Sequence, residues 1–364
     1  VERAIGELER AVQMQPESVE ARYHLGRALF TAERASEALP HLEEALRLID
    51  DEGPVQFLLA QVYLQLGRFE EAGVALDAAD ASRPGYAPVS YYRAELCYRL
   101  GKLDIARDLL EAVIDSAPEW NLPLVRAGTV AMELGDPHAA VLWFRVALDL
   151  DQSSTNARLW MRLASAYAAA NQVEEAIDGY RNAVAARPRL LPPRVALMNQ
   201  LSGLQKHDEL LEVIDDLFAI HPDNPLGHYQ RAQVLSLRGE TDAAMEDVEI
   251  ALRGFEEQAA SLDAPVDSTG EELQQEEPEG GRHTYLTLAK GLRLQLLQKA
   301  GRDDDAEALA RQLVQEAPWY PEAHFVLGTL LLRKRDEAGR QEMEIFKQLS
   351  DCLLYTSDAA DDLA

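Results

Sequence analysis

Small and apolar residues recur along this chain with a period of 34 residues. One column of the repeat is alanine, and the column twelve residues further on is proline. The alanines are Ala4, Ala38, Ala72, Ala106, Ala140 and, after a two-residue shift, Ala176; the prolines are Pro16, Pro84, Pro118, Pro188, Pro222 and Pro318. A fixed period of about 20 to 50 residues predicts stacked repeats rather than one globular core.

Each repeat predicts two amphipathic helices. Counted from Val19, small residues occupy the eighth, twentieth and twenty-seventh places of a unit, and large apolar residues lie between them. The eighth place holds Gly26, Ala60, Ala94, Gly128, Ala164, Ala232 or Gly328, and the twenty-seventh holds Ala11, Ala45, Ala79, Ala147, Ala183 or Ala251. With about 3.6 residues per turn, these small residues mark where two helix backbones approach closely. A glycine at the fifteenth place, as in Gly67 and Gly101, predicts the turn between the helices.

By these columns the chain resembles the tetratricopeptide repeat (TPR) family. The resemblance covers about nine units from Val1 to about Leu349, and the first of them is only a second helix. It implies an all-α fold, a right-handed α-solenoid (superhelix) of helix-turn-helix units. The alternative, another array of helical hairpins, would lead to the same functional class.

We expect four parts along the chain. Residues 1–255 form the main TPR array, 256–282 an acidic disordered insert, 283–349 the C-terminal TPR units and 350–364 a tail. The unit Leu191–Asn224 departs from the pattern, because large residues fill all three small places, which should push its helices apart or rotate them. These large residues are Met198, Leu210 and Leu217.

The expected insert is the most acidic stretch of the chain. From Glu256 to Gly281 it holds nine acidic residues, several prolines and glycines, and no Lys or Arg. So little apolar surface cannot offset the entropy lost on ordering, which predicts a disordered loop. The functional alternative is a regulatory flap or a docking site for a basic partner.

The chain end has a different character. Residues Cys352 to Asp361 resemble a translated sequencing adapter, so we expect the tail 350–364 to be artefactual and the natural chain to continue with other residues. Val1 already lies inside a predicted second helix. We therefore expect the chain to be a fragment at both ends.

Net charge narrows the choice of partner. The 364 residues include 35 basic and 63 acidic side chains, a net charge of −28. Such a surface repels nucleic acid and anionic lipid, so a neutral or basic protein or peptide is the expected partner. No apolar run approaches the roughly 18 residues of a membrane span. The chain is therefore expected to be soluble and cytoplasmic by default, with export left open by the missing N-terminus.

The sequence contains no pattern that predicts catalysis. Phosphate-binding glycine loops, nucleophile elbows and zinc-protease motifs are absent, and the histidines are scattered over different repeats. Cys97 is the single cysteine outside the tail, at a usually apolar place, which indicates a buried inert thiol. We therefore assign no catalytic, cofactor-binding or metal residue, and expect the chain not to be an enzyme.

A candidate binding surface follows from the resemblance, which implies that first helices line a concave groove. Their fifth and ninth places lie one turn apart on the same face. The fifth place is mostly aromatic or aliphatic and the ninth is polar, which suits an extended peptide, although the family pattern itself favours part of this composition. The groove residues are Tyr23, Arg27, Phe57, Gln61, Tyr91, Glu95, Thr129, Asn199, Tyr229, Gln233 and Phe325.

Three functional classes remain open at this stage. A non-catalytic protein-protein interaction scaffold is favoured, ahead of the partner-binding arm of a larger enzyme or assembly factor and of a self-contained enzyme. A subgroup of the resembling family captures acidic chaperone C-termini with a lysine at the fifth place. No unit here has lysine at that place, so chaperone-tail binding is not expected.

Overall fold

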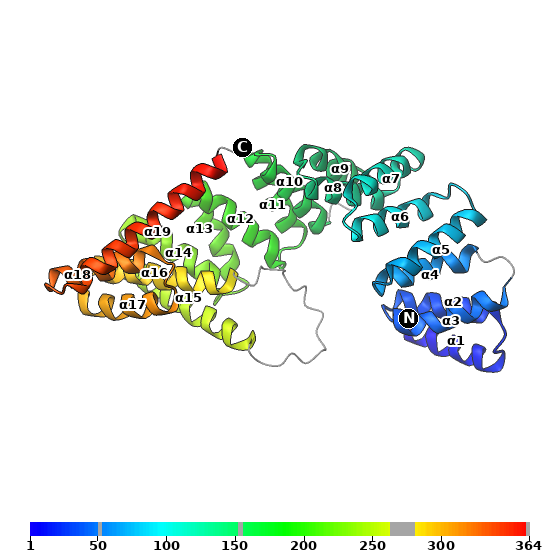
Figure 1. The fold of residues 1–364 in the computed structure, drawn as a ribbon, viewed down its shortest axis with the longest axis horizontal. Coiled ribbons are helices and arrows are strands. Elements are labelled where there is room, and N and C mark those ends of the chain that lie inside the picture. The colour runs from blue at the N-terminus through cyan, green and yellow to red at the C-terminus, as the bar shows by residue number, and fades with distance from the viewer. Residues whose placement is uncertain (50–52, 152–155, 263–280, 362–364) are drawn as a thin grey trace. The chain divides into compact units, whose positions relative to one another are not determined.

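The computed structural model describes residues 1–49, 53–151, 156–262 and 281–361. Within these ranges it contains nineteen α-helices and no strand, arranged as successive antiparallel pairs (Figure 1). The first helices of the pairs are α2 (Val19–Thr31), α4 (Gly53–Gln65), α6 (Ala87–Arg99), α8 (Asn121–Glu133), α10 (Ala157–Ala169), α12 (Leu191–Gly203), α14 (Pro225–Arg238), α16 (Gly281–Lys299) and α18 (Pro321–Arg333).

The second helices of the pairs alternate with these along the chain. They are α1 (Glu2–Met14), α3 (Ala35–Leu48), α5 (Phe69–Ser82), α7 (Leu103–Ser116), α9 (Pro137–Leu150), α11 (Val173–Ala186), α13 (His207–Phe218), α15 (Thr241–Leu262), α17 (Asp303–Glu316) and α19 (Ala338–Asp361). The all-α prediction, an array of helix pairs that opens with a lone second helix, is confirmed.

The small places are points of close helix contact. The alanines of the twentieth place from Ala38 onward, among them Ala106 and Ala140, are completely buried, whereas Ala4 of the lone helix α1 is exposed. A methyl group added to Gly128, at the eighth place of α8, would lie 2.5 Å from the Phe144 ring of α9. The two helices of a unit therefore approach too closely there for any side chain on α8.

The first helix of each pair ends at the fifteenth place in a left-handed residue. Gly101 has φ of 70° in this turn, and the amide of Lys102 donates to the Cys97 carbonyl over 2.8 Å. That bond satisfies a carbonyl group at the end of α6, which the helix itself leaves without a partner. Four units place another residue type in the same conformation: Glu33, Asn171, Gln205 and Arg335, with φ between 56° and 62°.

A buried histidine links the two helices of one pair. His228 of α14 lies with Nδ1 2.7 Å from Asp247 Oδ1 of α15 and with Nε2 2.8 Å from the Pro222 carbonyl oxygen. Arg231 also donates to Asp247, over 2.6 Å. The two histidine contacts recur in the last pair, where His324 Nδ1 lies 2.7 Å from Glu342 Oε2 and Nε2 lies 3.0 Å from the Pro318 carbonyl oxygen. Asp247 is therefore buried with two partners.

The chain divides into two compact units, Val1–Pro193 and Arg194–Ala364. The division falls within α12, in the repeat Leu191–Asn224 that departs from the pattern through large residues at its small places. Met198, Leu210 and Leu217 are nevertheless buried, at 0%, 1% and 0% exposed.

The acidic insert and the tail differ from expectation where the structure describes them. Helix α15 continues through Glu256 and Glu257 to Leu262, and α16 already begins at Gly281. Residues 256–262 contain no proline or glycine, so nothing in them stops the helix. The centre of the predicted loop lies outside the described residues. At the other end α19 extends to Asp361, beyond the predicted end near Leu349. No helix among the described residues is both long and apolar enough to cross a membrane.

Candidate functional site

The first helices of the N-terminal unit present two of the predicted groove pairs to solvent. Tyr23 of α2 is half-buried and Arg27, one turn later, is exposed, with its Cζ 5.8 Å from the centre of the Tyr23 ring. On the neighbouring helix α4, Phe57 and Gln61 are both half-buried. Since α2 contacts α4, these four side chains lie on adjacent helices.

Aromatic rings occupy the space between α4 and the next first helix. The Phe57 ring lies 5.4 Å from the ring of Tyr92 and 6.0 Å from that of Tyr86, both at edge-on angles. Such edge-to-face pairs stabilise a structure by about 0.5–1.5 kcal/mol beyond the area that they bury. One side of the Phe57 ring therefore packs against the neighbouring unit.

Two predicted anchors belong to the interior and not to an open surface. Tyr91 is 7% exposed and its ring lies 5.0 Å from that of Trp120. Tyr229 is 6% exposed, and its hydroxyl accepts a hydrogen bond from Gln233 Nε2 over 2.9 Å. Burial, with a smaller contribution from the neighbouring Tyr285 hydroxyl, raises the pKa of Tyr229 to about 12. Neither ring is open to a partner, which corrects the expectation for both residues.

The predicted hydrogen-bonding group Glu95 is also engaged. It is 7% exposed, and its two carboxylate oxygens form ion pairs with Arg99 at 3.0 Å and with Arg126 at 2.8 Å. Thr129 donates to the Val125 carbonyl over 3.0 Å and accepts from Arg162 over 2.7 Å. Glu95 and Thr129 therefore join first helices of successive units.

Three arginines that the sequence analysis did not single out lie beside this network; we call Arg126, Arg158 and Arg162 the arginine cluster. The Cζ of Arg126 lies 4.7 Å from the centre of the Tyr98 ring, whose hydroxyl donates to Glu133. The pKa of Arg162 is lowered, first by partial desolvation and then by the positive charges of Arg126 and Arg158. Arg162 is therefore close enough to each of the other two guanidinium groups to be affected by its charge.

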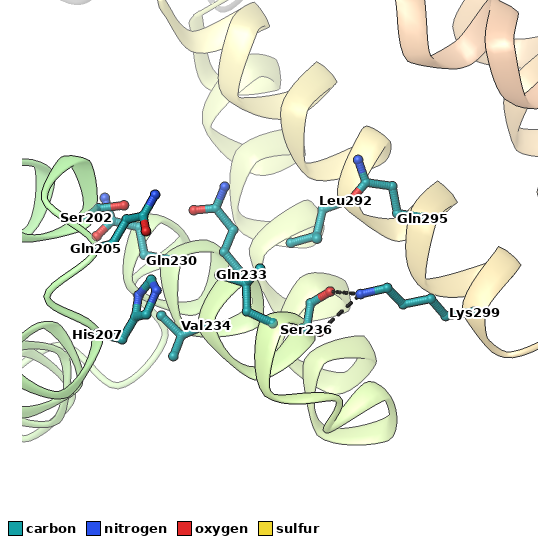
Figure 2. A pocket seen from close by; sticks show the side chains of 11 residues that line it. Ser202, Gln205, His207, Gln230, Gln233, Val234, Ser236, Leu292, Gln295 and Lys299 are labelled. Atoms are coloured by element: carbon teal, nitrogen blue, oxygen red, sulfur yellow. Dashed lines mark hydrogen bonds between the residues drawn. The ribbon is translucent and has the colours of Figure 1, made fainter.

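The C-terminal unit contains a polar hollow of about 520 Å³, shown in Figure 2. It is lined by Ser202, Gln205, His207, Gln230, Gln233, Val234, Ser236, Leu237, Leu292, Gln295 and Lys299. Lys299 of α16 points toward α14, where its Nζ donates to the Ser236 carbonyl over 3.0 Å and to the Ser236 hydroxyl over 2.9 Å. Four of the lining side chains are amides: Gln205, Gln230, Gln233 and Gln295.

Of the predicted groove residues, one lines this hollow and a second is hydrogen-bonded to a lining residue. Gln233 lines it, and Asn199 accepts a hydrogen bond over 2.8 Å from Gln230, a buried lining residue. The other amide atom of that side chain, Gln230 Oε1, makes no hydrogen bond to the described protein groups. Phe325 lies elsewhere in the unit, 43% exposed, with its ring 5.1 Å from that of Phe346.

The three residues of the arginine cluster were not predicted from the sequence for one common reason. Arg126 and Arg162 stand at the sixth place and Arg158 at the second, whereas only the fifth and ninth places were considered. A comparison of the charges on first and second helices would have singled them out. As for other chemistry, no three His, Cys, Asp or Glu side chains of the described ranges gather as a metal site requires.

The fold and its repeat pattern define a class of helical repeat proteins. One family model described as tetratricopeptide repeat matches residues 29–84, and a second matches residues 1–54, 57–121, 91–155 and 125–190. Together these matches cover more than half of the chain. The chain belongs to the tetratricopeptide repeat family.

Solved structures of TPR proteins include one with a TM-score above 0.5, which shows the same fold, and others that are similar with lower scores. A TPR protein segment from Cytophaga hutchinsonii has a TM-score of 0.56 and 11% identity, covering 64% of this chain and 94% of its own. A TPR protein from Parabacteroides merdae has a TM-score of 0.48 and 14% identity over 74% of this chain and 98% of its own. A thermophilic TPR protein from Thermus thermophilus has a TM-score of 0.42 and 23% identity, over 50% of this chain and 99% of its own. No curated protein sequence matches the chain significantly.

Proposed function

We propose that the chain is a non-catalytic scaffold that binds an extended polypeptide on the face formed by its first helices. The observation that carries this proposal is the pairing of accessible apolar and polar side chains on adjacent helices. Tyr23, Arg27, Phe57 and Gln61 lie on α2 and α4, which contact each other. Aromatic rings supply rigid contact area, and the amide and guanidinium groups can pair with a peptide backbone.

Because some predicted groove residues are buried, the proposed binding surface is smaller than the sequence predicted, but it remains. Tyr91, Tyr229 and Glu95 hold neighbouring helices in place, whereas Tyr23, Arg27, Phe57 and Gln61 keep exposed surface. In the C-terminal unit the amide-rich hollow adds a second polar surface, with Gln233 from the ninth place in its lining. Amides both donate and accept, as the backbone of an extended peptide requires.

The test is a selection of random displayed peptides on the chain, followed by affinity measurement for the enriched peptides. Replacing Tyr23 and Gln61 together by alanine should weaken binding at least about tenfold, because a few anchors dominate such interfaces. The control replaces Val74 and Leu142, exposed residues of second helices, by alanine. Enriched peptides that respond to the control variant and not to the Tyr23 variant would place the binding surface on the second helices.

A further inference from the structure

The N-terminal unit separates its charges between the two helices of each pair. Its first helices carry seven arginines and three glutamates, and its second helices carry six arginines and eighteen acidic residues. The arginines of the first helices are Arg22, Arg27, Arg93, Arg99, Arg126, Arg158 and Arg162. The first-helix face therefore carries net positive charge in a molecule whose total charge is −28.

Within this face, the arginine cluster is where few positive charges are paired with carboxylates. Arg158 is exposed and makes no hydrogen bond or ion pair among the described residues, and Arg162 bonds only the hydroxyl of Thr129. Arg126 pairs with Glu95, but that carboxylate already has a second arginine, Arg99. Positive charge thus exceeds negative charge on α8 and α10, where only Glu133 adds a further carboxylate.

Local charge decides which partner can approach this surface. At physiological salt, interactions between exposed charges fade over about 8 Å, roughly the distance between packed helices. The acidic second helices therefore act on an incoming ligand mainly from afar, whereas the arginines act on it at contact. The expectation of a neutral or basic partner was based on the total charge alone.

We propose that the first-helix face of the N-terminal unit binds an acidic polypeptide segment, whose side-chain carboxylates pair with Arg126, Arg158 and Arg162. This inference rests on the proposed function and adds the chemistry of the partner. A guanidinium group binds a carboxylate through two parallel hydrogen bonds, the geometry in which arginine is strongest. Three guanidinium groups on two helices require several carboxylates, which an internal acidic segment supplies and a single chain end does not.

The rest of the face fits a polypeptide better than a nucleic acid. Tyr98 lies against Arg126 with its hydroxyl turned to Glu133, and Val125 and Met161 are half-buried nearby on the same helices. An acidic peptide places apolar side chains between its carboxylates and can use both kinds of surface. A nucleic acid carries a charge at every phosphate, so the acidic second helices would repel it more strongly.

The experiment compares three variants in the full chain. Enriched peptides from the displayed library are measured by fluorescence anisotropy with wild type, with Arg158→Glu/Arg162→Glu, and with Arg145→Glu as the matched control. Arg145 is an exposed arginine of the second helix α9 without an ion pair among the described residues. Each enriched acidic peptide is also measured in an amidated form and as a counterpart with every Glu and Asp changed to Lys.

The proposal predicts that the enriched peptides are acidic and that amidation of their C-terminus leaves their affinity unchanged. Arg158→Glu/Arg162→Glu should weaken their binding at least about tenfold, whereas Arg145→Glu should not. Equal or tighter binding of the lysine counterparts would overturn it. So would equally tight binding of a single-stranded oligonucleotide, or dependence on a free C-terminal carboxylate.

Hydrogen exchange separates failure of this inference from failure of the proposed function. Enriched peptides that protect the first helices without responding to the arginine variant would overturn the acidic partner and leave the scaffold proposal standing. Protection of no first helix by any enriched peptide would overturn both. A circular dichroism spectrum of each variant checks that it remains helical.

Discussion

At the scale of single residues, the repeat restricts which residue can occupy a place through the size of the side chain and the backbone conformation. Gly128 is a glycine because the Phe144 ring occupies the place of a side chain, whereas Gly6 of α1 has no heavy atom within 4 Å of an added methyl group. The two glycines look alike in the sequence. Only one of them is required by close contact.

Gly128→Ala should lower the free energy of unfolding by about 1–3 kcal/mol, because the added methyl group overpacks the contact between α8 and α9. Gly6→Ala, the control, should be neutral or stabilise by up to about 1 kcal/mol, since alanine favours the helix. Urea unfolding followed by circular dichroism measures both. Equal effects of the two substitutions would show that the Phe144 ring moves aside freely.

Glu33→Gly should stabilise the chain by about 0.5–1 kcal/mol. Glu33 has φ of 62°, a conformation that is unfavourable for residues with a Cβ and free of penalty for glycine. The reverse change, Gly101→Ala, should destabilise by a similar amount, because Gly101 has φ of 70° in the equivalent turn. Thermal melts of both variants test the pair, and a less stable Glu33→Gly variant would contradict the explanation.

At the scale of helices, the boundaries could be predicted almost entirely from the sequence. Places one and fifteen of a predicted unit coincide with the start of a first helix and with its left-handed end, as at Ala87 and Gly101. The exception is α16, which begins at Gly281, before place one of its unit. The period is easy to detect because the same contact is repeated. The lengths of α15 and α19 were missed, since segments beyond the last small place have no recurring contact to fix where they end.

The candidate site was harder to predict than the helices. A place in the repeat indicates the face of the helix but not the exposed fraction of one side chain, which depends on neighbours from other units. Tyr91 shows this, because Trp120, just before the next first helix, covers its ring. The contact between His228 and Asp247 was missed for a similar reason, since it depends on how α14 and α15 cross.

The His228 and Arg231 contacts to Asp247 should make the C-terminal unit sensitive to acid. Burial acts to raise the pKa of Asp247, but the hydrogen bonds from Arg231 and His228 outweigh it and hold that pKa below the ordinary 3.8. A carboxyl with a lowered pKa in the folded state contributes stability above its unfolded pKa. That stability is lost as the pH falls through the folded value, which lies below 3.8.

Asp247→Asn should therefore destabilise the chain by about 3 kcal/mol at neutral pH, because two charged or polar partners lose a buried carboxylate. The difference from wild type should shrink as the pH is lowered below about 4. Glu246→Gln, an exposed neighbour on α15, is the control. Unfolding measured over a pH series would contradict the account if Asp247→Asn cost the same at every pH.

At the scale of the whole molecule, stability is a sum of contacts between neighbours, so damage should remain local. Ala106→Leu overpacks a completely buried place on α7 and should cost about 1–3 kcal/mol. Amides of α6, α7 and α8 should lose hydrogen-exchange protection while those of α14 and α18 keep theirs. Ala112→Leu, at an exposed place of α7, is the control. A uniform loss of protection along the chain would contradict local coupling.

The regular spacing of first helices also bears on how such a chain changes over generations. Helices α6 and α8 begin at Ala87 and Asn121, one period apart. An in-frame deletion of residues 87–120 would join Tyr86 to Asn121 and keep every later place in step. Gene duplication or loss in whole periods thus lengthens or shortens the binding face by one helix pair, without any need for a new core.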